Sequence, residues 1–524
     1  MALANLVHAT SFVERQANFP QIAGDASSDS TARFPTNKQN EPTIAVNPTD
    51  PTHLLLAGAN DEQREPPCGP GPVRGLTAPA NDCSFFPDIG TSGVYASSDG
   101  GASWTNRGVL DDQAGWLASP FVSDGDPVIV YGPKPDGNGG FSYANGARAY
   151  YASLASYKSG QSPFPPGKFP ELVVVSYSDD DGVTWSAPVI AFTKENPNNF
   201  NDKEDIWADR NPNSQFFGRV FVSWTQFRGA QIINLSSEPV VVTYSADGGS
   251  SFTAGKQLSP GGKNNGTNNG RQGSAVRSGP DGSVYVAWEE LSAQVVAISR
   301  DGGASWSHPI TIGPVADIES PIPGANFRTD SFLTIAADPR AGSSKLYAAW
   351  VNRTRGGGRV VVSTSTNKGA SWGSLVTVST AANGYAFFQG LDVAPDGRVD
   401  IGYQALKATD TRTFGTGNAF IDAYYVKKSP SSWSTPLKVT TVSSDPAASA
   451  ANSLTEQFFG DYNTLVSSSA NAWFIYTDSR HGAGCPAVDN YQKNLATAPK
   501  PAPQLDCPSS QFGNTDAFVS VITP

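Results

Sequence analysis

The stretch "SRDGGASW" at Ser299–Trp306 decides the fold, because it places an Asp, two Gly and a Trp at fixed offsets between two β-like segments. Nearly the same phrase occurs four more times, as "SSDGGASW" from Ser97, "SDDDGVTW" from Ser178, "SADGGSSF" from Ser245 and "STNKGASW" from Ser365. Five copies of one short phrase indicate a repeat architecture, in which every copy belongs to one supersecondary unit.

The residues of this phrase suit a hairpin turn that is closed by its own side chains. An Asp accepts hydrogen bonds from nearby backbone N–H groups, and a Gly two residues later supplies the positive φ that such a turn needs. The final Trp or Phe is expected to pack under the turn. Because a fold repeats one acid in every unit whereas an active site does not, we predict a structural role for these acceptors: Asp99, Asp180, Asp247, Asp301 and Asn367.

The pattern Ser-x-Asp-x-Gly-x-Ser/Thr-Trp resembles the Asp-box of the sialidase (neuraminidase) superfamily, and its copies extend from Ser97 to Trp372. The resemblance implies a β-propeller, commonly a carbohydrate-active one. Propellers that are not sialidases also carry Asp-boxes, so the motif predicts the fold more firmly than the reaction.

A longer pattern surrounds each box and sets the number of units. It consists of an apolar strand, a turn, a second strand ending in an aromatic residue, a variable loop and a strand into the box. Its copies begin at Glu41, Asp126, Asp202, Arg271, Asp330, Gln389 and Gly460. Seven units predict an all-β chain with a single β-propeller of seven four-stranded antiparallel blades. The alternative is the six-bladed propeller that the sialidase resemblance implies.

We expect residues 36–524 to form the propeller and residues 1–35 to contribute the strand that closes the ring, from the segment "ATSFVER". Closure of the ring would remove exposed strand edges.

The composition excludes two classes of partner. The net charge of −11 and the pI near 4.9 argue against nucleic acid or an anionic membrane surface. No apolar run approaches the roughly 20 residues of a membrane span. We expect a monomer whose partner is a carbohydrate.

The four cysteines give evidence about the cellular location of the protein. The simplest pairing joins Cys68 to Cys83 and Cys485 to Cys507, although three connectivities exist and four free thiols are the alternative. Disulfides between loops indicate an oxidising, extracellular location. The N-terminus "MALANLVHAT" does not have the pattern of a signal peptide, so we expect a secreted protein whose signal peptide is not part of this chain.

The order of strands predicts on which face the functional site lies. If the first strand of each unit lines a central channel, the boxes and the first-to-second turns lie on one face. The variable loops then lie on the other face, where functional loops belong. These loops are Asp61–Ser92, Gly132–Pro170, Gln226–Glu238, Gln404–Phe420 and Asp478–Asn514.

The sialidase resemblance assigns candidate roles on that face. Sialidases use a Tyr nucleophile activated by a Glu, an Asp acid/base and three Arg that bind the substrate carboxylate. The segment "GDYNTL" resembles the strand that carries the nucleophile, which places Asp461 and Tyr462 in the catalytic group. Glu290 or Glu289 is the candidate activating partner of the Tyr, and Asp61 is the candidate acid/base. The candidate substrate-binding residues are Arg271, Arg328, Arg64, Arg480 and Gln389.

One departure from the family pattern weakens a strict sialidase assignment. The Arg-Ile-Pro signature of the first strand is replaced by "NEP" at Asn40–Pro42, so one of the three Arg must come from elsewhere, such as Arg64 or Arg480.

Three functions remain open. The leading hypothesis is an extracellular, sialidase-like enzyme that cleaves a glycosidic bond in an acidic glycan, containing sialic or uronic acid, at the channel mouth. A uronate-directed polysaccharide lyase is the first alternative, with His481 and Tyr462 as base and acid. The second alternative is a non-catalytic propeller that binds a glycan or a protein.

No cofactor is required by any of these hypotheses. A structural Ca²⁺ is a further hypothesis, because four acidic side chains gather at the starts of two first strands: Asp124, Asp126, Asp202 and Glu204. In the alternative interpretation, these side chains pair with Lys203 and with backbone amides.

Overall fold

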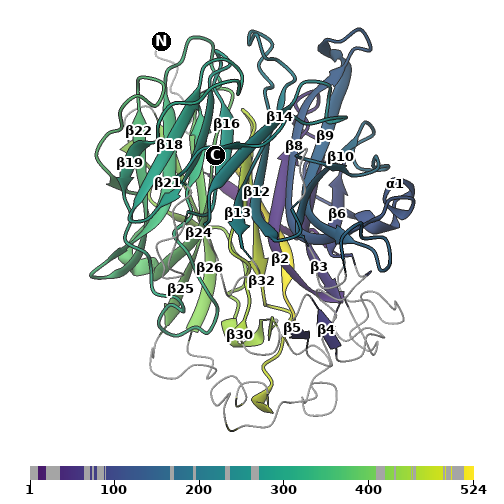
Figure 1. The fold of residues 1–524 in the computed structure, drawn as a ribbon. Helices are drawn as coiled ribbons and strands as arrows, with labels where there is room; N and C mark the ends of the chain where they lie inside the picture. The colour runs from purple at the N-terminus through teal and green to yellow at the C-terminus, as the bar shows by residue number, and fades with distance from the viewer. Residues whose placement is uncertain are drawn as a thin grey trace, which may run out of the picture.

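The chain folds into seven antiparallel sheets of four strands, with β28 added to the sixth (Figure 1). This computed structural model describes residues 10–18, 36–63, 71–73, 76–78, 88, 90–165, 170–192, 196–229, 237–260, 271–408, 419–429, 432–449, 451–452, 456–487, 490, 497 and 513–524. The predicted seven-bladed propeller is confirmed, and the six-bladed alternative is wrong.

The first three blades follow one another along the chain. Blade 1 contains β2 (Thr36–Val46), β3 (Leu55–Gln63), β6 (Ser92–Ser97) and β7 (Thr105–Val109). Blade 2 contains β8 (Phe121–Pro135), β9 (Phe141–Tyr157), β10 (Leu172–Ser178) and β11 (Val189–Ile190). Blade 3 contains β12 (Asn199–Ala208), β13 (Val220–Arg228), β14 (Val240–Ser245) and β15 (Lys256–Gln257).

The next three blades repeat this order. Blade 4 contains β16 (Ala275–Ser278), β17 (Val284–Glu290), β18 (Ala293–Ser299) and β19 (Ile310–Pro314). Blade 5 contains β20 (Thr334–Ala337), β21 (Leu346–Thr354), β22 (Gly357–Ser365) and β23 (Val376–Thr377). Blade 6 contains β24 (Tyr385–Val393), β25 (Val399–Ala408), β26 (Ala419–Ser429), β27 (Ser432–Trp433) and β28 (Leu437–Lys438).

The seventh blade combines the two ends of the chain. It contains β31 (Thr464–Ser467), β32 (Ala472–Asp478), β33 (Asp516–Thr523) and β1 (Ser11–Gln16). β1 pairs with β33 in antiparallel register, from Ser11 opposite Thr523 to Gln16 opposite Phe518. The segment expected to close the ring therefore contains the outermost strand of blade 7, while the domain boundary after residue 35 stays a prediction.

Short elements lie outside the blades. Two small hairpins consist of β4 (Gly71–Val73) with β5 (Leu76–Ala78), and of β29 (Ala451–Asn452) with β30 (Glu456–Gln457). Helical turns are formed by η1 (Leu110–Asp112), α1 (Ala114–Leu117), η3 (Ala381–Asn383) and η4 (Pro446–Ala448). In the described part of the chain, no helix has the length and apolarity that crossing a bilayer requires.

The core lies between neighbouring blades and is built largely from the second strands. Their aromatic residues are fully buried: Trp224, Trp288, Trp350 and Trp473. Trp350 of blade 5, for example, packs against Gly313 and Ile312 of blade 4. Burying large aromatic side chains between sheets explains why the repeating pattern ends each second strand in such a residue.

The five repeated turns share one set of hydrogen bonds. In the fourth copy, the Ser299 hydroxyl donates to Asp301 Oδ1 at 2.8 Å and accepts from the Gly303 N–H at 2.8 Å. The Ser305 N–H also donates to Asp301 Oδ1 at 2.8 Å. Gly303 has a φ of 92°, as the turn chemistry predicts. The same bonds recur in the other four copies, at Asp99, Asp180, Asp247 and Asn367.

The prediction for the segment Gly132–Pro170 is wrong. It was expected to be a variable loop on the face opposite the boxes, but β8 and β9 stay paired as far as Pro135 and Phe141, so their turn lies on the face of the boxes. Only residues 158–171 join β9 to β10 on the opposite face. The apolar and aromatic residues of Ala147–Tyr157 are compatible with a strand.

Most of the cysteines lie outside the described residues. Cys485 is described, is 4% exposed and is not a free thiol. The pairings of Cys485 with Cys507 and of Cys68 with Cys83 stay predictions, because the other three cysteines fall in undescribed segments.

Candidate functional site

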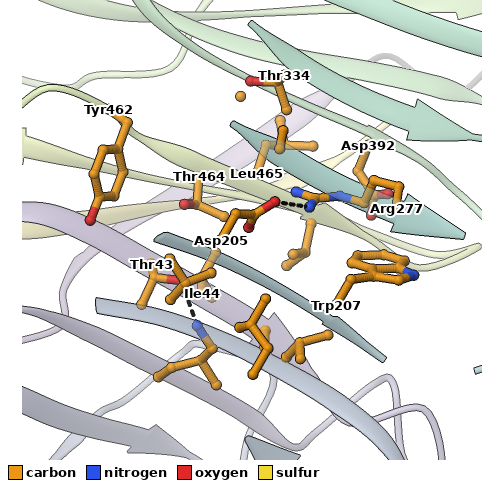
Figure 2. A pocket seen from close by; sticks show the side chains of 18 of the residues that line it. Thr43, Ile44, Asp205, Trp207, Arg277, Thr334, Asp392, Tyr462, Thr464 and Leu465 are labelled. Atoms are coloured by element: carbon orange, nitrogen blue, oxygen red, sulfur yellow. Dashed lines mark hydrogen bonds and ion pairs between the residues drawn. The ribbon is translucent and has the colours of Figure 1, made fainter. Parts of the chain in front are cut away.

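A cavity of about 140 Å³ lies inside the ring and is lined by the first strands of all seven blades. We call the end at which these strands begin the mouth and the end at which they finish the distal end. Figure 2 shows Tyr462 on one side of the cavity and Trp207 on the other, with Asp205 and Arg277 between them. Because the second strands run antiparallel to the first, they end on the side of the mouth.

The backbone at the mouth is locally strained in a repeated way. Four of the seven first strands contain a non-Gly residue with positive φ: Glu41 (52°), Asp126 (52°), Lys203 (57°) and Phe388 (46°). In β2, β8, β12 and β24 the pairing register shifts at this point, as at a β-bulge. A non-Gly residue in such a conformation costs about 1–3 kcal/mol, and strain of this kind is concentrated at functional sites.

Three of the strained positions carry charged side chains that meet the start of blade 7. We define the mouth cluster as Glu41, Asp126, Asp202, Lys203, Glu204, Arg328, Asp461 and Tyr462. Lys203 Nζ lies 3.7 Å from Glu41 Oε1 and 3.4 Å from Asp461 Oδ2. It also lies 3.9 Å from the centroid of the Tyr462 ring. The Lys203 side chain is only 6% exposed, so this ammonium is held by the protein rather than by water.

Asp461 is the ionised carboxylate of the cluster. Arg328 binds it in bidentate geometry, with Nε at 2.8 Å from Oδ1 and Nη2 at 2.7 Å from Oδ2. Burial would raise the pKa of Asp461, but the charges of Arg328 and Lys203 outweigh it and lower the pKa to about 2. The Arg328 side chain is itself 49% exposed, so its outer surface faces solvent.

The pKa values of two other carboxyl groups of the cluster are shifted in the opposite direction. Burial, with the charge of Asp126 next in size, raises the pKa of Glu41 well above its usual value. Burial also raises the pKa of Glu204 well above its usual value, and neither of its oxygens has a hydrogen-bond partner among the described residues. Asp126 is intermediate, with burial raising its pKa to about 6. Carboxyl groups with raised pKa values and a carboxylate with a lowered pKa therefore lie in one site.

Glu41 and Asp126 are positioned through a shared amide side chain. Asn60 Nδ2 donates to Glu41 Oε2 at 2.8 Å, and the Asp126 N–H donates to Asn60 Oδ1 at 2.9 Å. Asn60 lies within β3, so blades 1 and 2 are joined directly behind the cluster.

The hydroxyl of Tyr462 is buried and has no hydrogen-bond partner among the described residues. Burial, and then the nearby carboxyls of Asp126, Glu41 and Glu204, raise the pKa of Tyr462 well above its usual value. Losing a proton to a neighbouring base would therefore require a change in these charges, such as the arrival of a ligand.

The candidate Glu residues have partners other than the Tyr462 hydroxyl. Glu290 Oε1 pairs with Arg271 Nε at 2.6 Å, and Glu290 Oε2 accepts from Trp288 Nε1 at 2.8 Å. Glu289 lies beside Asp317 and Asp330. The carboxyls that act most strongly on Tyr462 come instead from blades 1, 2 and 3, beginning with Asp126.

Four other candidates are engaged in their own contacts outside the mouth cluster. Asp61 accepts from Gln39 Nε2 at 2.6 Å and from the Tyr95 hydroxyl at 3.1 Å, and burial raises its pKa to about 6. His481 Nδ1 lies 2.8 Å from Asp516 Oδ2, and this contact raises the pKa of the His.

Arg480 pairs with Glu14 and Asp478, and Gln389 Nε2 donates to the carbonyls of Phe332 and Ala349. Arg64, the remaining candidate, lies outside the described residues.

The predicted calcium ligands are only partly brought together. Asp126, Asp202 and Glu204 meet at the mouth, but the ammonium of Lys203 lies close enough to stabilise their charges. Asp124 acts electrostatically on Asp111 instead. Within the described ranges, the one acidic group with oxygens at ligand distance, all within 4.8 Å, consists of Glu289, Asp317 and Asp330. The Ca²⁺ hypothesis stays a prediction.

Glu41 and Lys203 are the members of the cluster that sequence reasoning did not assign a function. A usable signal exists for Glu41, because "EPT" and "DPV" at Glu41 and Asp126 place an acid and a Pro at the same point before the apolar strand. Lys203 was considered only as a partner of the neighbouring acids, and its central position depends on the ring geometry.

Comparisons with known proteins give only distant likenesses. No family model matches the chain, and no curated protein does. Among solved structures, the chain is similar to an intramolecular trans-sialidase from leech, at 13% identity and a TM-score of 0.41, over 74% of this chain and 67% of that one. It is also similar to the NanB sialidase from Streptococcus pneumoniae, at 11% identity and a TM-score of 0.40, over 84% and 90% of the two chains.

A third similar structure is an α-L-arabinofuranosidase from Fusarium graminearum, at 11% identity and a TM-score of 0.40, over 71% of this chain and 89% of that one. Since the identities and TM-scores are low, the function is argued from the residues of this chain.

Proposed function

We propose that the chain is an extracellular carbohydrate-active enzyme that hydrolyses a glycosidic bond in an acidic glycan at the channel mouth. The observation that carries the proposal is the Tyr462 hydroxyl. It is buried, lacks a partner among the described residues and borders the cavity together with Lys203 and Glu204. A buried hydroxyl without a hydrogen bond does not stabilise the fold. The Tyr462 hydroxyl is therefore available to a ligand in the cavity.

The opposite pKa shifts around Tyr462 suit glycoside hydrolysis. Glu41 or Glu204, whose pKa values are raised by burial, donates a proton to the leaving glycosidic oxygen, while the phenol oxygen of Tyr462 attacks the anomeric carbon and passes its proton to Asp126. The C–O bond to the leaving group breaks as the bond to Tyr462 forms. Water then attacks the same carbon as its bond to Tyr462 breaks, and the sugar is released. The proton that the water loses goes to the Glu carboxylate, and Asp126 returns its proton to the Tyr462 oxygen.

The cations of the cluster support an acidic sugar. Lys203 and Arg328 are both within ion-pair distance of Asp461, and the half-exposed Arg328 can turn its outer N–H groups to a substrate carboxylate. A Tyr nucleophile also suits such a substrate, because a carboxylate nucleophile would be repelled by its charge.

The decisive experiment is a screen of sialosides, rhamnogalacturonans and uronic-acid polysaccharides, with products identified by mass. Hydrolysis adds one water to each cleaved bond and supports the proposal. An unsaturated uronate that absorbs ultraviolet light identifies a lyase instead. Binding of an acidic glycan without any turnover identifies a non-catalytic propeller.

Replacing Tyr462 by Phe tests the catalytic assignment. The Tyr462→Phe variant keeps the ring and its contact with Lys203, so we expect substrate binding to survive while turnover falls by about 10²–10⁴-fold.

Tyr150→Phe is the matched control for that variant. The Tyr150 hydroxyl is also buried without a hydrogen-bond partner in the described part of the chain, but it lies in the core of blade 2 and not at the mouth. Its turnover should stay at the wild-type level. Equal turnover of the Tyr462→Phe variant and the wild type would remove Tyr462 from the reaction.

A further inference from the structure

The distal end of the channel carries an aromatic and cationic group of side chains that the proposed reaction does not use. Trp207, at the end of β12, has two guanidinium groups near its ring centroid, that of Arg210 at 4.2 Å and that of Arg277 at 4.6 Å. Asp205 and Asp392 complete this group, which we call the distal cluster. All five residues line the cavity.

Arg277 and Trp207 are fixed in place by contacts on the protein side. Arg277 Nη1 lies 2.5 Å from Asp205 Oδ2 and 2.6 Å from the Val276 carbonyl oxygen. Figure 2 shows the ion pair of Arg277 with Asp205 as a dashed line. Trp207 Nε1 donates to the Ser278 hydroxyl at 3.1 Å. Blades 3 and 4 therefore present the Trp ring and one guanidinium in a fixed arrangement.

Arg210 differs from Arg277 because its guanidinium is not bound by other side chains of the described residues. Among the described residues, it forms neither an ion pair nor a hydrogen bond through its side chain. The nearest candidate, Asp392, accepts from the backbone N–H groups of Val393 and Ser467, both at 2.8 Å. The Arg210 guanidinium acts on Asp392 only through its charge. Its N–H donors are thus left for a ligand at the distal end.

The surrounding turns hold Arg210 at this position. The long hairpin of β8 and β9, which rises at the upper right of Figure 1, reaches blade 3, where the Tyr143 hydroxyl donates to the Arg210 carbonyl at 3.2 Å. Tyr143 also contacts Phe217 edge-on, with ring centroids 5.5 Å apart. Arg210 lies in the turn between β12 and β13, residues 209–219. In blades 4 and 6, the turns between the first and second strands are shorter, at residues 279–283 and 394–398.

We propose that the distal cluster is a second binding site, which takes a small ligand bearing a single carboxylate. Arg210 donates a bidentate pair of hydrogen bonds to this carboxylate, and Arg277 supplies a second positive charge. Planar guanidinium groups match carboxylates in this geometry, and stacking on an aromatic ring keeps the guanidinium plane fixed.

The charges of the cluster favour a monoanion over a dianion. Arg277 is already neutralised in part by Asp205, and Asp392 lies across from Arg210. A sulfate or phosphate dianion would place its second charge against these carboxylates, whereas a carboxylate needs the donors of one guanidinium only. The site is distinct from the mouth cluster, where Lys203 and Arg328 are paired with Asp461.

Calorimetric titration with glucuronate, glucose and inorganic sulfate tests the proposal. The full chain carrying Arg328→Gln is used as the host, so that binding of a carboxylate by Arg328 at the mouth is removed. We expect saturable glucuronate binding in this host, no binding of glucose, and sulfate binding weaker than that of glucuronate. Adding Arg210→Gln should weaken glucuronate binding about tenfold or more.

Arg219→Gln, also added to the host, is the matched control. Arg219 stacks on Tyr244 at 4.3 Å and on Phe216 at 4.8 Å, but it does not line the cavity. Its loss should leave glucuronate affinity unchanged. The proposal is overturned if the host does not bind glucuronate, if Arg210→Gln and Arg219→Gln give equal affinities, or if sulfate binds more tightly than glucuronate. None of these results depends on turnover, so they leave the proposed reaction untouched.

Discussion

At the scale of single residues, the repeated Asp and the mouth acids show how position changes the role of one side-chain type. Asp301 is exposed and accepts from Ser305 through both its hydroxyl and its N–H, which lowers its pKa to about 2. Asp126 is buried, and its pKa rises to about 6. Local sequence predicts the first environment, because all its partners lie within a few residues. The second environment arises from residues of four blades, and no local pattern contains it.

Substitution of Asp301 tests the structural role of the turns. Asp301→Ala should lower the free energy of unfolding by about 1–3 kcal/mol through lost turn hydrogen bonds, while the activity of each folded molecule stays the same. Asp301→Asn should cost less, since Asn367 makes the same bond to the Ser371 N–H at 2.9 Å in the fifth copy. Denaturant unfolding and specific activity check both variants. A fully folded, inactive Asp301→Ala protein would contradict the structural role.

The charge of Asp301 also makes the stability of the fold depend on pH. Because its folded pKa of about 2 lies below the usual 3.8, ionisation stabilises the fold above pH 3.8, and this contribution is lost as pH falls towards 2. The stability of the wild type relative to Asp301→Asn should therefore decline over that interval.

At the scale of elements, β1 depends on one charged side chain. Glu14 is 3% exposed and pairs with Arg480 Nη2 at 2.6 Å, and it also accepts from the hydroxyls of Thr441 and Tyr476. Burial raises the pKa of Glu14, but these hydrogen bonds outweigh it, so the pKa is lower than usual. Sequence placed the strand correctly but assigned Arg480 to the substrate, because its partner lies 466 residues away.

Glu14→Gln should lower the free energy of unfolding by about 3 kcal/mol, because Arg480 stays buried with one partner fewer. Val13→Thr on the same strand is the control, since Val13 is 47% exposed and should tolerate the change. The effect of Glu14→Gln should be full above pH 4.5 and should shrink as pH falls below it, where Glu14 takes up a proton. Equal stability of both variants at neutral pH would contradict the pairing.

At the scale of the whole molecule, the number of blades could be predicted because each unit repeats its own local chemistry. The candidate site could be predicted only as a face of the ring, together with Asp461, Tyr462, Arg328 and the acids of blades 2 and 3. The partners of Tyr462 could not be predicted, because they come from first strands that face each other only once the ring is closed. The β8–β9 hairpin was misplaced because its length departs from the repeat.

Deletion of residues 1–17 tests closure of the ring. Without β1, the backbone of β33 (Asp516–Thr523) becomes an open edge, and Arg480 loses Glu14. We expect a lower melting temperature and concentration-dependent aggregation, measured by calorimetry and light scattering. A chain that begins at Thr10 keeps β1 and serves as the control. Identical behaviour of both truncated chains would show that blade 7 is stable with three strands.

The pairing of β1 with β33 also means that β1 is synthesised long before its partner strand. A ribosome adds about 5–20 residues per second, so the roughly 500 residues between these strands take on the order of 25–100 s to synthesise. During that interval, β1 has left the ribosome while its partner does not yet exist. The backbone of β1 and its apolar residues Phe12 and Val13 are then free to pair elsewhere, and a chaperone that shields this first segment would raise the yield of correctly closed rings.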